Sequence, residues 1–325
     1  MNKHWNFIVL TCLFFGWGFI TVLNDLLTPI LKNTFMLNQF EANFVAFAFF
    51  IAYFVGGLFY FVSSLIGVRF FVNLGYKGLI LLGLILAGIG CLIFIPAGML
   101  KSYPIFLIGL FAIGFGFAFL QIAANPLVLI SGEQQTAASR LNFVQGFNSL
   151  ASTLAPILGV LIFYKLLNVS DNHESLKYPY LVFFIFFMLL AFLIKNLLHV
   201  QENHSSAVEI NKPYALNHLN LIFGAVAIFF YVGSEVSIGT NFITLLKSND
   251  TLGLSENVAG SLLAFYWGGA MIGRFLGGIA LSSCSSTIKK LFYMVVVACI
   301  LTGLILFISS SHVNLIYYMY FIWYI

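Results

Sequence analysis

Two acidic residues lie well inside long apolar stretches of the chain, Asp25 in TVLNDLLTPIL and Glu235 in YVGSEVSIG. An ionised carboxylate at the centre of a lipid-facing membrane helix costs at least about 2.5 kcal/mol, so each should face a cavity or a partner. A carboxylate in such a place can bind a cation or exchange a proton, which predicts a role in coupling an ion to transport. The alternative for both is a structural carboxylate satisfied by neighbouring helices.

Amide side chains form two stripes in the middle of the chain. Gln121 and Asn125 are four residues apart, and Asn142, Gln145 and Asn148 recur at three-residue spacing, so each set shares one face of a helix. Amides on an inward face can hydrogen-bond a polyhydroxylated ligand, as a sugar site requires. Hydrogen bonds between packed helices, each worth roughly 0.6 to 2 kcal/mol, explain the same spacing.

Membrane-spanning helices must position these residues. Hydrophobic residues make up 61% of the 325-residue chain and charged residues 7%, whereas about a quarter of a soluble domain is charged. Apolar runs of about 20 residues match a hydrocarbon core of about 30 Å and predict an all-α, polytopic membrane protein. A further run begins near His312 and stops short of a full span. The nine complete runs are expected at 6–31, 42–68, 77–99, 103–130, 141–166, 179–199, 217–246, 257–282 and 288–310.

The longest polar segment, HVQENHSSAVEINKPYALNH, divides the chain. It predicts an N-terminal six-helix bundle at 1–199, a cytoplasmic linker at 200–216 and a partial C-terminal bundle at 217–325. The aromatic-Gly-Gly helix FFIAYFVGGLFY is echoed by AFYWGGAMIGRFLGG, as in a duplicated transporter half. Lys and Arg are enriched in the segments between apolar runs that lie on the same side of the membrane as the N-terminus. Because such basic segments face the cytoplasm, the pattern predicts a cytoplasmic N-terminus.

Four motifs, LNDLLTP, AANP, RLN with QGFNS, and GRF, together resemble the fucose:proton symporter family of the major facilitator superfamily. The resemblance implies two six-helix bundles around a central site, the second incomplete. About nine and a half spans are present, so the chain looks C-terminally truncated. The resemblance also implies that Asp25 binds the coupling proton and that Asn148 contacts the sugar. Gln121 and Glu235 depart from the fucose permeases toward the glucose/galactose transporter branch, which leaves the coupling ion open between H⁺ and Na⁺.

We therefore expect a secondary active transporter that imports a hexose by cation symport with alternating access. The arginines at cytoplasmic helix ends are expected to close the inward gate through charge-assisted hydrogen bonds. The expected site residues are Asp25 and Glu235 for ion coupling; Asn24, Gln121, Asn125, Gln145 and Asn148 for substrate binding; and Arg69, Arg140 and Arg274 for gating.

Other classes of function find less support in the residues. No catalytic or phosphate-binding motif occurs, and the glycines of GLFAIGFGFAFL lie within a helix and favour close packing, so we expect no enzyme. The four cysteines have no paired spacing, so neither a metal site nor a cofactor is expected. The expected partners are a sugar substrate and the lipid bilayer, and no nucleic acid is expected to bind. We expect a monomer in the cell (inner) membrane. The alternatives are a truncated non-transporting product, a sugar-binding membrane protein, a fucose or N-acetylglucosamine importer, or a channel.

Overall fold

The computed structural model describes residues 2–66, 69–167, 173–198, 217–248, 253–254, 256–283 and 286–310. The side chains of Asp25 and Arg69 lie outside this description, although both residues belong to helices. The linker expected at 200–216 and the apolar run expected from His312 also lie outside the described residues.

The described chain forms nine long helices, and each overlaps one of the nine predicted runs. Eight of them, α1 to α7 and α9, contain segments that are long and apolar enough to cross a membrane. Short 3-10 or π-helical turns lie at Gln134–Thr136, Leu161–Leu166 and His173–Leu176. The helices are α1 (Asn2–Thr34), α2 (Gln39–Leu65), α3 (Arg69–Met99), α4 (Tyr103–Ile130), α5 (Ala137–Val160), α6 (Lys177–Leu197), α7 (Leu219–Lys247), α8 (Glu256–Ala280) and α9 (Thr287–Ser310).

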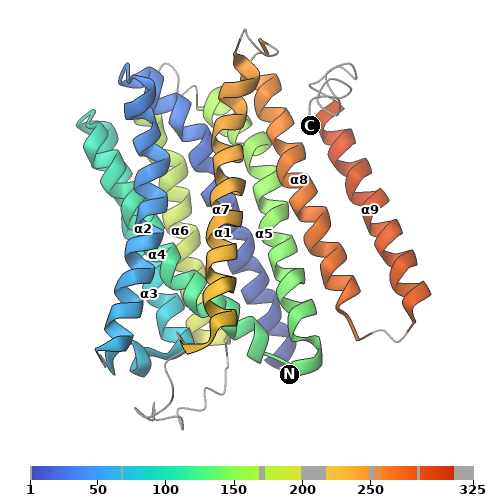
Figure 1. Cartoon of the computed structure of the whole chain (residues 1–325). Coiled ribbons are helices and arrows are strands. Elements are labelled where there is room, and N and C mark those ends of the chain that lie inside the picture. Colours follow the sequence, from blue (N-terminus) through green and yellow to red (C-terminus); the bar gives the residue numbers. More distant parts are fainter. Residues whose placement is uncertain are drawn as a thin grey trace.

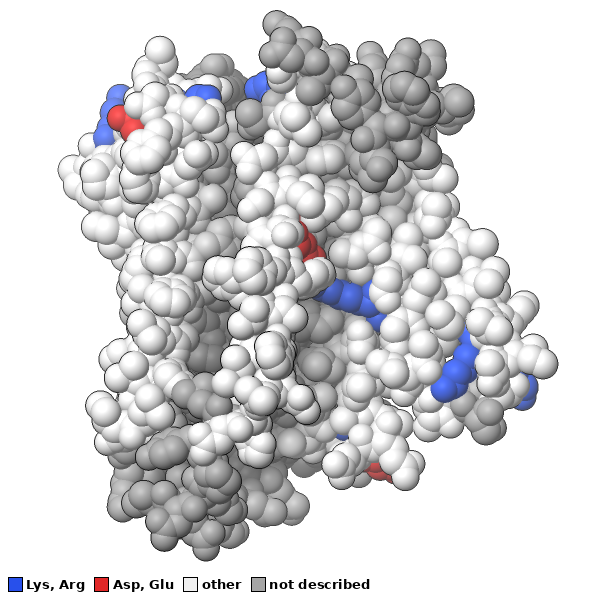
Figure 2. All heavy atoms as spheres, in the orientation of Figure 1, with Lys and Arg blue, Asp and Glu red and all other residues white. Residues whose placement is uncertain are grey.

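The helices run side by side between two ends of the molecule, with the N-terminus at one end and α9 at one edge (Figure 1). Figure 2 shows charged side chains gathered mostly near the two ends of the face drawn, with one adjoining acidic and basic group midway between them. Apart from these two groups, the intervening described surface of this face is uncharged, as a hydrocarbon environment favours. This distribution fits a bundle that crosses a bilayer from end to end.

Glycines set how closely the helices of the first bundle approach. A Cβ at Gly116 of α4 would lie 2.5 Å from the carbonyl oxygen of Gly83 and 2.7 Å from the amide nitrogen of Ala87, both in α3. Small residues at such crossings let the backbones meet, which is the packing expected of GLFAIGFGFAFL. The helix α3 is also interrupted at Gly75, where φ is 62°, and its segment that is long and apolar enough to cross a membrane is Asn73–Met99.

The helices α5 and α8 connect the first six helices to the last three. The ring of Phe275 lies 5.7 Å from that of Phe143 and 5.5 Å from that of Phe147, centroid to centroid. A Cβ at Gly146 would meet the Phe275 ring at 2.8 Å, so a glycine is what admits this ring. Ser139 in the first turn of α5 donates a hydrogen bond of 2.6 Å from Oγ to the carbonyl of Gly278, near the end of α8. These contacts join the first six helices to α8.

Candidate functional site

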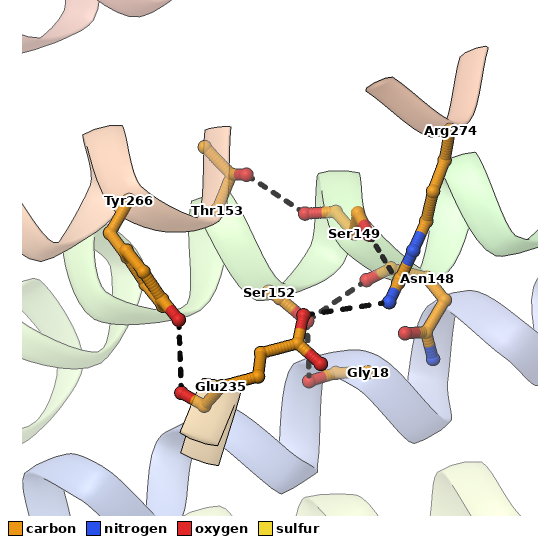
Figure 3. A network of polar contacts seen from close by, with 8 residues as sticks. All are labelled: Gly18, Asn148, Ser149, Ser152, Thr153, Glu235, Tyr266 and Arg274. Carbon is orange, nitrogen blue, oxygen red and sulfur yellow. Dashed lines mark hydrogen bonds and ion pairs between the residues drawn. The ribbon is translucent and has the colours of Figure 1, made fainter. Parts of the chain in front are cut away.

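An ion pair between two half-buried side chains joins α7 to α8 midway between the two ends of the molecule (Figure 2). Nη2 of Arg274 lies 3.8 Å from Oε1 of Glu235, and the two side chains are only 29% and 14% exposed. Figure 3 shows the two side chains pointing toward each other above α1 and beside α5. The hydroxyl of Tyr266 also donates a hydrogen bond of 3.0 Å to the main-chain oxygen of Glu235, which ties this part of α7 to α8. The second intramembrane carboxylate predicted from the sequence therefore has a positive partner.

The same arginine reaches the first bundle. Nη1 of Arg274 donates a hydrogen bond to Oγ of Ser149 in α5, a residue that is 1% exposed (Figure 3). Ser149 is held in turn by its helix, since its carbonyl accepts from Thr153 Oγ1 at 2.8 Å. The guanidinium of Arg274 thus contacts both halves of the molecule: it pairs with Glu235 of α7 and donates a hydrogen bond to Ser149 of α5. Its planar array of donors makes both contacts possible at once.

The amide stripes meet, and part of their hydrogen-bonding capacity is used between helices. Gln145 Nε2 donates to Asn125 Oδ1 at 3.0 Å, and Asn125 Nδ2 donates to the carbonyl of Gln121 at 3.2 Å. Asn148 Nδ2 donates to the carbonyl of Phe14 in α1 at 2.9 Å. These bonds connect α4 and α1 to α5, as the helix-packing interpretation predicts. Polar atoms still unused include the exposed amide of Gln121 and Oδ1 of Asn148.

Asn24 lies in a different environment from the other amides. Its side chain is 2% exposed, and neither Oδ1 nor Nδ2 has a hydrogen-bond partner. Asn24 continues the buried stripe of Ile20 and Leu27, at three- and four-residue spacing along α1. Its side chain is therefore buried among apolar neighbours, and it makes no hydrogen bond to the amides of α5.

Asp25 is placed by its helix alone, because its side chain lies outside the described residues. Gly18 of α1 packs so closely on Asn148 of α5 that a Cβ there would collide with it. Residue 25 follows Gly18 by about two helical turns, so the two Cα atoms lie on one face of α1, about 10 Å apart along the helix. At the depth of residue 25, a Cβ at Gly159 of α5 would meet Leu23 and Leu26 of α1.

The predicted gating arginines have different positions. Arg140 donates to the carbonyls of Leu129 and Glu133, both at 2.8 Å, and to Oγ1 of Thr136 at 2.6 Å. These bonds secure the end of α4 to the start of α5 inside the first bundle, so they do not join the two halves. Arg274 lies before the last turn of α8 and points inward, unlike the helix-end position expected from the sequence. The side chain of Arg69 lies outside the described residues.

Sequence reasoning missed Ser149, Tyr266 and Ser139, all of which bond across helices. The only available signal for Ser149 was its position directly after Asn148 in QGFNS, since a serine by itself is a common residue in a membrane helix. Among the described residues, no group of three or more His, Cys, Asp or Glu side chains could hold a metal ion.

Comparison with known proteins identifies the family. The family model of the Major Facilitator Superfamily matches residues 5–325. The chain belongs to this superfamily. The protein is accordingly a multi-pass membrane transporter and not an enzyme.

Two kinds of relatives are similar to this transporter over most of its length. A glucose/galactose transporter of Brucella abortus (strain 2308) is 42% identical over 287 residues, which are 86% of this chain and 68% of that protein. A crystal structure of the Escherichia coli fucose:proton symporter FucP, determined for a point variant, superimposes with a TM-score of 0.66 at 26% identity, over 88% of this chain and 73% of that one. FucP in the outward conformation gives a TM-score of 0.67 at 28% identity, over 86% and 72% of the respective chains.

Proposed function

We propose that this transporter imports a hexose of the glucose or galactose type by cation symport, through alternating access. The observation that carries the proposal is the 42% identity to a glucose/galactose transporter over 86% of the chain. The similarity to a fucose:proton symporter supports coupling to a cation, with a proton or sodium ion as the candidates. Alternating access is the motion by which repeat-built transporters expose a central site to each side in turn.

The amides on α4 and α5 are the proposed sugar-binding groups. Gln121, Gln145 and Asn148 lie on faces that meet, and each keeps polar atoms that the hydrogen bonds between helices do not use. Asn125 links two of these residues and would fix their orientation. Asn24 is 2% exposed and has no hydrogen bond to these residues, so its contribution would be indirect.

Asp25 is the proposed coupling residue. Its Cα lies on the same face of α1 as Gly18, which packs against the proposed sugar-binding residue Asn148. A carboxylate that is neutralised by a proton or a cation becomes cheaper to enclose, so ion binding would favour the closed state that carries sugar. This links the energy of an ion gradient to sugar uptake.

Proteoliposomes with the Asp25→Asn variant test this coupling. We expect gradient-driven accumulation of labelled sugar to be lost, while exchange of internal for external sugar continues. Glu133→Gln is the matched control, because Glu133 is an exposed carboxylate between α4 and α5, and it should accumulate sugar normally. Unchanged accumulation in Asp25→Asn would exclude Asp25 as the coupling residue.

The substrate and the ion are separable in the same vesicles. Uptake of labelled glucose, galactose, N-acetylglucosamine and L-fucose is measured under a proton gradient and, separately, under a sodium gradient. We expect glucose or galactose to be accumulated under one of the two gradients. Sugar binding without any flux would instead favour the sugar-binding, non-transporting alternative.

A further inference from the structure

The pairing of Glu235 changes what this carboxylate can do. Its side chain is 14% exposed, and its ion-pair partner is the guanidinium of Arg274. A carboxylate that already faces a guanidinium is charge-compensated, so a proton or a sodium ion would bind there in competition with Arg274. Removing either partner leaves the other as an uncompensated charge inside the protein.

Arg274 also lies at one end of a row of contacts between the two halves of the molecule. Along the antiparallel pair α5 and α8, Ser139 bonds to Gly278 and the Phe275 ring packs over Gly146. Farther into the molecule, Arg274 bonds to Ser149. These contacts involve only two helices, so they break together if α5 and α8 separate.

The ion pair and this row of contacts meet in a single side chain. One edge of the Arg274 guanidinium faces Glu235 in the second half, and another nitrogen donates to Ser149 in the first (Figure 3). Arg274 has a long side chain with many rotamers, so fixing the one rotamer that reaches Ser149 costs conformational entropy. The carboxylate of Glu235 supplies that restraint from within the same half.

We propose that Glu235, Arg274 and Ser149 form a latch that holds α5 against α8. Glu235 is a positioning residue that keeps Arg274 extended toward Ser149, and it is not an ion-binding residue of the transport cycle. Each time α5 and α8 part, the bond to Ser149 breaks and the pair with Glu235 persists, which leaves Arg274 ready to close again. The role in the transport cycle rests on the proposed alternating-access function, whereas closure itself can be measured without sugar.

Cross-linking between Ser139→Cys and Gly278→Cys reports closure, because these positions adjoin when α5 and α8 are in contact. The reporter pair is placed in full-length protein whose four native cysteines are replaced by alanine. We expect Ser149→Ala, Arg274→Gln and Glu235→Gln each to slow cross-linking by roughly tenfold, the effect of losing one charge-assisted hydrogen bond. The matched control is Ser64→Ala, an exposed serine of α2, which should cross-link at the original rate.

Transport measurements then separate positioning from ion binding. In proteoliposomes, Glu235→Gln should transport more slowly but reach the same accumulation ratio, whereas Asp25→Asn should lose accumulation. The Glu235→Gln/Arg274→Gln double variant should be more stable in detergent than either single variant, because it leaves no uncompensated charge.

An unchanged cross-linking rate in Glu235→Gln would overturn the latch. Loss of accumulation with retained exchange in that variant would also overturn it, since that result assigns ion coupling to Glu235. If the charged-residue variants do not fold, Ser149→Ala alters no charge, and an unchanged cross-linking rate in this variant overturns the latch by itself. Failure of sugar uptake in the unmodified protein would contradict the proposed function and leave the cross-linking result interpretable.

Discussion

Asn24 and Asn125 are both amides inside apolar helices, and the bundle satisfies only one of them. Asn125 accepts a hydrogen bond from Gln145 and donates one to Gln121, whereas the buried amide of Asn24 has no partner. An amide buried without hydrogen bonds costs about 1 to 3 kcal/mol in mutational data. Asn24 therefore lowers the stability of the first bundle, while Asn125 contributes to it.

Replacing Asn24 with leucine, which branches at the same atom and carries no polar group, should remove this cost. We expect Asn24→Leu to raise the free energy of unfolding by about 1 to 3 kcal/mol, seen as a higher melting temperature in detergent. The matched variant Asn125→Leu should lower it by roughly 1 kcal/mol, because it breaks two bonds of modest strength. A lower melting temperature for Asn24→Leu would show that its amide is satisfied after all, for example by a bound water.

Neighbouring residues in α1 illustrate how far the sequence could define the site. Asn24 and Asp25 are adjacent in LNDLLTP, and the sequence predicted substrate binding for Asn24 and ion coupling for Asp25. In a helix, adjacent positions point about 100° apart, and the packing of α1 buries Asn24 in the first bundle. The pairing of Glu235 with Arg274 was equally hidden, because nothing in the sequence specifies how α7 and α8 are rotated toward each other.

At the scale of the helices, the glycines of α4 fix the distance to their neighbours. The helices themselves were predictable, since a run of about 20 apolar residues is a signal that the sequence carries directly. The glycines of GLFAIGFGFAFL also indicated close packing, but their partners became known only from the fold. Gly116 meets main-chain atoms of Gly83 and Ala87, which cannot move aside as a flexible side chain could.

We therefore expect Gly116→Ala to destabilise the protein by about 1 to 3 kcal/mol, as overpacking of a tight core does. Gly57→Ala in α2 is the matched control, because a Cβ at Gly57 meets nothing within 4 Å. This control should be neutral or slightly stabilising, since alanine favours a helix more than glycine by up to about 1 kcal/mol. Equal melting temperatures for the two variants would contradict the close contact between α3 and α4.

At the scale of the whole molecule, the contact between α5 and α8 defines which end is closed. The start of α5 and the end of α8 lie at the same end as the N-terminus (Figure 1). The distribution of Lys and Arg predicts that this end faces the cytoplasm. If so, the cytoplasmic end is closed, and the central site of this state would be reached from outside.

The orientation can be tested with single cysteines in a protein whose native cysteines have been replaced. Met36 follows α1 and is 89% exposed, and Gln135 is an exposed residue between α4 and α5, at the opposite end of the molecule. In intact cells, a membrane-impermeant maleimide should label Met36→Cys and spare Gln135→Cys, and opening the cells should make both reactive. The reverse pattern would place the N-terminus outside, and the closed contact between α5 and α8 would then block the outer entrance. Sugar import would in that case begin from a different state than the one described, so the orientation decides how the latch enters the transport cycle.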